Sequence, residues 1–330
     1  RPMPDPDGVV AGVPELGGGA ATPWFRLPPG ARGGVPGAPV PLTVAGRTLA
    51  WGQRTYVMGI LNVTPDSFSG DGLLGDGRDG RDAATTACDV ARAMVADGAD
   101  ILDVGGESSR PGHAAVSSEE EVRRVVPVVA AVHAGLPDTP ISIDTIKPAV
   151  AAAALDAGAG MINDVWGVGD DDGLVRLAAE RGVPIVLMHN RAEARYTNLM
   201  AEIVADLERA IERALAANVR WDAIVVDPGF GFGKTPEHNL VLLRELEAIR
   251  LLGRPVLLGT SRKSTLGRVL DLSPDERVEA TVATTVLGIR AGVDIVRVHD
   301  VRANVRAARM TDAIVRAPAS TATQPEGDRS

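Results

Sequence analysis

Eight short apolar segments recur along the chain, and each is followed by a longer segment whose apolar residues have helical spacing. The short segments are rich in Val, Ile and Leu, which is typical of strands buried on both faces. These predicted strands lie at 55–62, 99–105, 140–144, 160–165, 184–189, 223–228, 255–260 and 295–300. The predicted helices lie at about 79–97, 117–134, 147–157, 171–181, 198–217, 237–249, 275–290 and 302–315.

This alternation predicts the α/β class with parallel strands, because each helix returns the chain to the same edge of the sheet. Eight strand–helix units in roughly 260 residues favour a single-domain (β/α)8 TIM barrel. A doubly wound open sheet is the main alternative, but no GxGxxG motif follows the first strand. The segment 41–53 carries a Gly turn and predicts a hairpin that plugs the barrel floor.

The two ends of the chain differ in composition from the predicted barrel. Residues 1–40 contain nine Gly and nine Pro, so we expect a disordered leader there. The barrel domain should occupy residues 41–316, and the small and polar residues 317–330 should form a flexible tail.

Charge and composition exclude several classes of partner. The net charge of −9 argues against nucleic acid as a general partner, because an acidic surface repels phosphate backbones. No run of 18 apolar residues occurs, so we expect no membrane association. Cys88 is the one cysteine, which excludes an internal disulfide and fits a cytoplasmic protein.

Polar or ionisable residues stand at the carboxyl end of nearly every predicted strand, where barrel enzymes carry their chemistry. A strand that reaches the surface becomes polar in any case, which explains one or two such residues. A ring of carboxylate, amide, imidazole, ammonium and guanidinium groups converging on one mouth favours a functional site. These residues are Asn62, Asp103, Glu107, Asp144, Asn163, Asp164, His189, Asp227, Ser261, Arg262, Lys263, Arg297, His299 and Asp300.

Arg297 and His299 are two residues apart on the last strand, so both side chains should point into the barrel. Such a pair is either matched by local carboxylates or kept for an anionic ligand. The last strands are the habitual phosphate site of this fold, which favours the ligand. Arg262 and Lys263 follow strand seven and give a second basic cluster beside this pair.

Asp144, Asn163 and Asp227 offer carboxylates and an amide inside the same mouth, a set suited to a flat heterocycle with a guanidine-like edge. Carboxylates in this position could also bind a metal or act as a general base, and periodicity does not distinguish these roles. Two long loops, 63–78 and 106–117, follow the first two strands and are expected to cover the mouth as a lid.

Seven of these segments together resemble the motifs of the dihydropteroate synthase family. The resemblance covers residues 55–310, and each motif stands at the end of the appropriate predicted strand. The motifs are MGILNVTPDSFS (58–69), DVGGESSRPG (103–112), SIDT (142–145), IND (162–164), DPGFGFGKT (227–235), TSRKS (260–264) and RVHDV (297–301).

The resemblance implies that the amine of p-aminobenzoate displaces pyrophosphate from 6-hydroxymethyl-7,8-dihydropterin pyrophosphate, which gives 7,8-dihydropteroate for folate synthesis. It also implies Mg²⁺ on the phosphates, a homodimer and sensitivity of the family to sulfonamides. Matched positions imply catalytic roles for Asp144, Lys263, Arg297 and His299, and a pterin pocket of Asp144, Asn163, Met188, Asp227, Phe232 and Lys263. They imply pyrophosphate binding by Asn62, Arg297 and His299, metal contact by Asn62, and p-aminobenzoate or loop contacts by Phe68, Ser109, Arg110, Pro111 and Ser264.

The chemistry agrees with this residue set. Charge grows on the leaving pyrophosphate, which Arg, His and a hard cation stabilise. An aromatic amine is already nucleophilic at neutral pH, so no catalytic Ser, Cys or strong base is required.

Two positions depart from the family pattern. Gly70 precedes Asp71 where Asp-Gly is common, which displaces any loop acid by one residue, and Ser109 stands where Thr is common.

Two alternatives stay open. One is a methyltransferase domain that binds methyltetrahydrofolate and uses a corrinoid partner, and the other is a non-catalytic paralogue.

Overall fold

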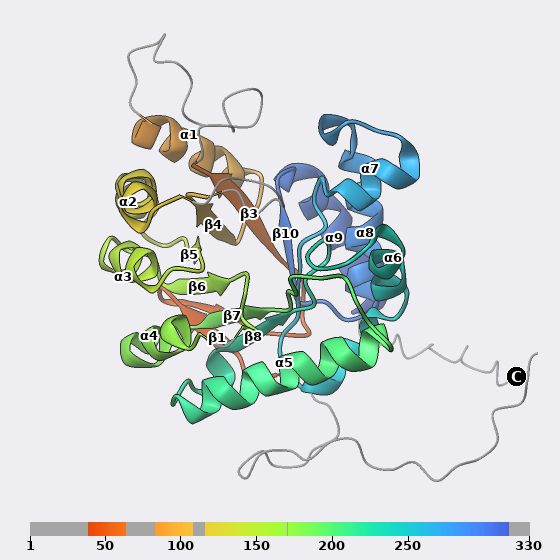
Figure 1. The fold of residues 1–330 in the computed structure, drawn as a ribbon. Coiled ribbons are helices and arrows are strands. Elements are labelled where there is room, and N and C mark those ends of the chain that lie inside the picture. Colours follow the sequence, from red (N-terminus) through yellow and green to blue (C-terminus); the bar gives the residue numbers. More distant parts are fainter. Residues whose placement is uncertain (1–38, 64–82, 108–115, 170, 317–330) are drawn as a thin grey trace, which may run out of the picture. The chain divides into compact units, whose positions relative to one another are not determined.

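Eight parallel strands form the centre of the protein in the computed structural model, which describes residues 39–63, 83–107, 116–169 and 171–316 (Figure 1). Their order is β8-β7-β6-β5-β4-β3-β10-β9. A parallel bridge between Val226 and Val256 joins the two outer strands and closes the barrel. The strands are β3 (Tyr56–Asn62), β4 (Ile101–Gly105), β5 (Ile141–Asp144), β6 (Met161–Asp164), β7 (Ile185–Met188), β8 (Ile224–Asp227), β9 (Leu257–Leu258) and β10 (Ile295–Val298).

Helices follow the strands and lie around the outside of the barrel (Figure 1). They are α1 (Ala83–Ala96), α2 (Ser118–Gly135), α3 (Pro148–Asp156), α4 (Gly173–Arg181), α5 (Leu199–Ala216), α6 (Pro236–Arg244), α7 (Ser264–Leu270), α8 (Val278–Arg290) and α9 (Val301–Val315). Short 3-10 turns lie at Trp221–Ala223, Leu246–Leu252 and Pro274–Glu276. The predicted barrel and all eight predicted strands are therefore confirmed.

Two helix predictions need correction. The segment predicted as one helix at 237–249 is divided, because α6 ends at Arg244 and a 3-10 turn begins at Leu246. The seven-residue helix α7 was not predicted. It begins directly after Lys263 without a side-chain cap, and it contains Gly267. The residue that ends it, Asp271, has the left-handed backbone conformation. The segment therefore lacks the usual sequence signals of a helix.

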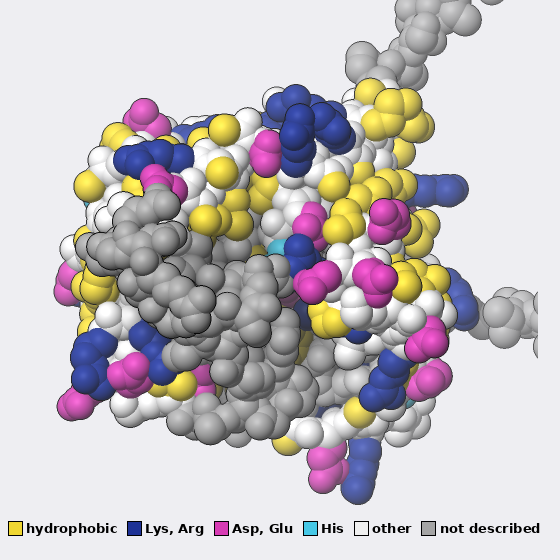
Figure 2. All heavy atoms as spheres, turned by 90° about the horizontal axis from the view of Figure 1, so that it is seen from above, with side chains coloured by type: hydrophobic (Ala, Val, Ile, Leu, Met, Phe, Trp, Pro, Cys, Tyr) yellow, Lys and Arg dark blue, Asp and Glu magenta, His cyan; other side chains and the backbone are white. Residues whose placement is uncertain are grey.

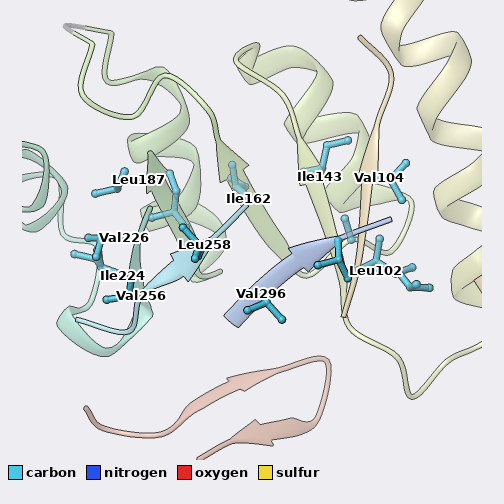
Figure 3. Packing of buried hydrophobic residues seen from close by; sticks show 14 of the residues in the cluster. Leu102, Val104, Ile143, Ile162, Leu187, Ile224, Val226, Val256, Leu258 and Val296 are labelled. Carbon is cyan, nitrogen blue, oxygen red and sulfur yellow. The ribbon is translucent and has the colours of Figure 1, made fainter. Parts of the chain in front are cut away.

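Residues alternate between two cores along each strand. Leu102, Val104, Val226 and Val296 belong to the larger cluster between strands and helices, part of which Figure 3 shows. The second cluster fills the inside of the barrel and combines strand residues with the hairpin of β1 (Leu42–Val44) and β2 (Arg47–Leu49). Its members are Leu42, Val44, Leu49, Trp51, Tyr56, Met58, Ile101, Met161, Val186, Val225, Leu257 and Ile295.

The hairpin lies across the foot of the strands, as the segment 41–53 predicts (Figure 3). Trp51 meets Tyr56 edge to face at 5.6 Å between ring centroids. The backbone N–H of Ala50 donates to the Tyr56 hydroxyl at 2.7 Å, which ties the hairpin to the first strand of the barrel. Because this end is filled by apolar side chains, polar side chains that face inward gather at the other end.

The predicted leader and tail lie outside the described residues, apart from the last residues before β1, as do most of the two long loops. Among the helices in the described ranges, none is both long and apolar enough to cross a bilayer.

Candidate functional site

Arg297 lies inside the barrel between two carboxylates. Its Nε donates to Asp103 Oδ2 at 2.6 Å and its Nη2 donates to Asp144 Oδ2 at 2.5 Å. Asn163 Nδ2 donates to the same Asp103 oxygen at 3.1 Å. Burial raises the pKa of Asp144 to about 7, although the charge of Arg297 opposes that rise. Of the two alternatives for a buried Arg, carboxylate matching is therefore what the structure contains.

Strand alternation places this cluster. Arg297 is two residues after Ile295 on β10, and Asp103 is two residues after Ile101 on β4. Ile295 and Ile101 both belong to the interior cluster, so the polar residues form the next layer towards the mouth. Asp144 pairs in register with Gly105 and Asn163, which brings β4, β5 and β6 to the same height.

Asp227, Lys263 and Phe232 form a second group beside the first. Lys263 Nζ lies 4.0 Å from the centre of the Phe232 ring and donates to the carbonyl oxygen of Phe230. Burial lowers the pKa of Lys263 to about 7, while the negative charges of Asp227 and Asp144 act in the opposite direction. Two carboxylates, an amide, an ammonium group and an aromatic face can together bind a flat, nitrogen-rich ring.

His299 and Asn62 stand at the carboxyl ends of neighbouring strands. Ser261 Oγ lies 3.0 Å from His299 Nδ1 and also accepts the His299 backbone N–H at 3.1 Å. Asn62 Nδ2 lies 3.5 Å from the other ring nitrogen, Nε2. With Arg297, these groups supply donors on one side of the mouth for an anion.

Figure 2 views the molecule from above, turned from Figure 1, and shows histidine, Lys/Arg and Asp/Glu side chains close together near the middle of this face. Met188 follows the interior residue Val186 by two positions on β7, so it also faces inward. Ser264 is the first residue of α7 and is exposed. Phe68, Ser109, Arg110 and Pro111 lie outside the described residues.

The expected convergence of all polar strand ends on one mouth is wrong for four residues. His189 pairs with Asp206, Asp300 with Arg262, and Glu107 with Lys147. Asp164 accepts the backbone N–H of Trp166. Asp164 is adjacent to the inward-facing Asn163 and therefore points to the helix side. The other three residues, His189, Asp300 and Glu107, lie beyond the last residue of their strands, where alternation no longer fixes the direction of a side chain.

Comparison with known proteins identifies the family. Residues 58–299 match the pterin binding enzyme family. Dihydropteroate synthase of Clostridium beijerinckii is 52% identical over 266 residues, which are 80% of this chain and 96% of that protein. The chain belongs to the dihydropteroate synthase family.

Two solved structures of this family are similar to the chain over nearly their whole length. Dihydropteroate synthase of Clostridium difficile, determined in the presence of pteroic acid, is 51% identical with a TM-score of 0.76 and covers 81% of this chain and 98% of its own. The Xanthomonas albilineans enzyme with 4-aminobenzoic acid is 41% identical with a TM-score of 0.78 and covers 85% of this chain and 100% of its own.

The sequence pattern places Asp103 and Arg262 at strand ends but does not show the contacts that they make. The contact of Asp103 with Arg297 joins β4 to β10 over the intervening strand β3, and no local pattern shows such a pairing. Arg262 binds Asp300 through Nε at 3.0 Å and Nη2 at 2.7 Å, which ties the turn before α7 to the end of β10. It does so in the left-handed conformation at φ 56°, which its sequence neighbours do not indicate.

Proposed function

We infer that this chain is a dihydropteroate synthase that joins the pterin methylene group to the amine of p-aminobenzoate and releases pyrophosphate. The observation that carries the inference is the placement of Asp144, Asn163, Asp227 and Lys263 beside Arg297 and His299 in one barrel mouth. The family relationship supports the same reaction.

The pterin ring, in this proposal, lies between Asp144, Asn163, Asp227, Met188 and the Phe232–Lys263 pair. Carboxylates accept hydrogen bonds from the guanidine-like edge of the ring, and the ammonium group donates to its acceptor atoms. Contacts from several sides fix the ring, and the methylene carbon attached to it then faces the incoming amine in one orientation.

Bond exchange follows from this arrangement. The amine lone pair attacks the methylene carbon, the carbon–oxygen bond to pyrophosphate breaks, and the amine then loses a proton. Negative charge grows on the leaving oxygen, where the donors of Arg297 and His299 stabilise it. Two of the five N–H groups of Arg297 are used by carboxylates in the described structure, so others can reach a phosphate oxygen.

A magnesium ion on the pyrophosphate suits this site. Among the described residues there is no cluster of three or more His, Cys, Asp or Glu side chains arranged for a metal. Mg²⁺ commonly takes few protein ligands when substrate phosphates supply the others. We propose that the Asn62 amide contributes one ligand and that the ion offsets the negative charge of Asp103 and Asp144 near the phosphates.

The remaining site residues are proposed from their matched positions. Ser264, at the start of α7, and Phe68, Ser109, Arg110 and Pro111 would contact p-aminobenzoate or close the site. The methyltransferase alternative gives no role to the Ser261–Lys263 turn or to the Arg297–His299 pair. We further propose a cytoplasmic location and a homodimer.

A pyrophosphate-release assay with dihydropterin pyrophosphate and Mg²⁺ tests the function. We expect release that depends on p-aminobenzoate, and its loss in Lys263→Ala and Arg297→Ala proteins that keep the circular dichroism of the wild type. Binding of methyltetrahydrofolate without any pyrophosphate release would support the methyltransferase instead. Unchanged turnover in both variants would refute the site assignment.

A further inference from the structure

Lysine is rare in this chain, since three of its 34 basic residues are lysines: Lys147, Lys234 and Lys263. Lys263 belongs to the proposed pterin pocket. Lys234 belongs to the loop that follows β8 and is not among the proposed substrate-binding residues. An ammonium group presents three donors in a compact tetrahedral arrangement, which the planar fork of Arg cannot imitate.

All three donors of Lys234 have an acceptor. Its Nζ lies 2.9 Å from His189 Nδ1, 3.0 Å from the Gly229 carbonyl oxygen and 3.1 Å from the Phe232 carbonyl oxygen. Lys234 would have to give up one of these contacts to bind a substrate. Its contacts therefore indicate a mechanical role, which is to join two points of the loop to the end of β7.

His189 links Lys234 to Asp206 on helix α5. Because Nδ1 accepts from Lys234, the proton of the neutral ring lies on Nε2, which donates to Asp206 Oδ2 at 3.1 Å. Asp206 is held in turn by Arg191 at 2.9 and 2.7 Å and by Arg209. Burial, together with the charge of Lys234, lowers the pKa of His189 to about 3, which keeps the ring neutral.

The loop that Lys234 holds carries the pterin-facing groups. The Gly229 backbone N–H donates to Asp227 Oδ1 at 2.7 Å, and the Phe230 carbonyl accepts from Lys263. The Phe232 ring lies under the Lys263 ammonium group. Gly229, Gly231 and Gly233 all have positive φ, at 69°, 82° and 54°. A run of glycines has little intrinsic preference for one conformation, so contacts from outside must fix it.

We propose that Lys234, oriented by His189 and Asp206, is a positioning residue that holds Phe232 and Lys263 in register for the pterin ring. This inference rests on the proposed function only for the identity of the ring. The hydrogen-bonded chain Asp206–His189–Lys234 itself can be tested without any substrate.

Substitutions at His189 give a matched pair. Glutamine can accept from Lys234 through its oxygen and donate to Asp206 through its amide, so His189→Gln keeps the chain, whereas His189→Leu interrupts it. Lys234→Met removes the three donors and keeps the length of the side chain. Arg181→Met serves as the control, because it removes an ion pair with an aspartate, Asp156 at 2.6 Å, that lies outside this chain of contacts.

The first measurement uses protein labelled with ¹³C-lysine, in which three Cε signals are expected and can be assigned by substitution. Lys234→Met and His189→Leu should shift the Lys263 signal, and His189→Gln and Arg181→Met should leave it near its wild-type position. ¹⁵N spectra should show a protonated Nε2 and an unprotonated Nδ1 for His189. The opposite tautomer, or a Lys263 signal unmoved by Lys234→Met, would refute the positioning role.

The second measurement separates the two substrates kinetically. We expect Lys234→Met and His189→Leu to raise KM for the dihydropterin pyrophosphate by about tenfold or more, as for loss of a charged hydrogen bond, with little change in KM for p-aminobenzoate. His189→Gln should recover most of this loss. Equal effects of Gln and Leu would contradict the inference, and a wild type without pyrophosphate release would contradict the proposed function while the lysine spectra still test the chain.

Discussion

Arg297 combines two roles that oppose each other. Its carboxylate partners stabilise the charge inside the barrel, yet they also place negative charge where the proposed pyrophosphate must bind. Asp103 Oδ1 is buried and has no hydrogen-bond partner among the described residues, and the same holds for Ser142 Oγ on the register-paired position of β5. Burial of this unpaired carboxylate oxygen is energetically unfavourable, and a purely structural role for Asp103 would not require it.

Replacement of Asp103 by Asn tests this opposition. We expect Asp103→Asn to lower the free energy of unfolding by about 3 kcal/mol, because it breaks half of a buried charge network. We also expect tighter binding of inorganic pyrophosphate, because one negative charge near Arg297 is removed. Urea unfolding and titration calorimetry measure the two quantities, and weaker pyrophosphate binding by a folded variant would contradict the argument.

His189 should make the stability of the protein depend on pH. Its pKa is about 3 in the folded protein and 6.5 for an ordinary histidine, with Lys234, Asp206 and Arg191 around the ring. Between these values the unfolded chain binds a proton that the folded chain does not, so stability is lost as pH falls from 6.5 towards 3. Between pH 7 and pH 5, the free energy of unfolding, measured with urea, should fall by about 2 kcal/mol more for the wild type than for His189→Gln. Parallel losses in the two proteins would show that His189 is not the titrating group.

Among the structural elements, the loop after β8 has the tightest backbone requirement. A Cβ on Gly229, at φ 69°, would lie 1.7 Å from the His189 carbonyl oxygen. Gly182 ends α4 at φ 63° with nothing within 4 Å of the added atom. The two glycines therefore both have a left-handed φ, and they differ in how crowded an added Cβ would be.

We expect Gly182→Ala to lower the free energy of unfolding by about 1 kcal/mol, which is typical of an alanine in the left-handed conformation. Gly229→Ala should cost at least about 3 kcal/mol, because backbone must move as well. Thermal unfolding compares the variants directly. Similar costs would mean that the loop adapts freely, which would also weaken the positioning role of Lys234.

The elements show which parts of the structure the sequence can predict. Strands such as β4 and β10 were predictable because both of their faces are buried, and alternation correctly turned Arg297 and Asn163 inward. Alternation could not place His189, which lies after the end of β7. The contact of Arg297 with Asp103 depends on the pairing of both β10 and β4 with β3, which brings together residues 194 positions apart in the sequence.

At the scale of the whole molecule, apolar side chains remain exposed on two neighbouring helices. On α9, Met310 is 65% and Ile314 is 68% exposed, and Leu287 on α8 is 52% exposed. The proposed homodimer would cover side chains of this kind, since exposed apolar patches commonly mark interfaces.

Light scattering should therefore give twice the chain mass of 34.3 kDa at micromolar concentration. Ile314→Glu should give the mass of one chain, because a buried unpaired charge strongly opposes association. Arg302→Glu, which changes charge on the same helix, serves as the control. A monomeric wild type would remove the dimer from the proposal.

The scarcity of lysine also gives the protein a built-in reporter of local opening. A lysine-specific protease can cut this chain after Lys234 and Lys263, whereas the bond after Lys147 is protected by Pro148. Both cleavable bonds lie in the two segments that build the barrel mouth. Cleavage of the native protein therefore requires opening of the mouth or complete unfolding, and a ligand bound in the mouth should slow it because the ligand binds the closed native state.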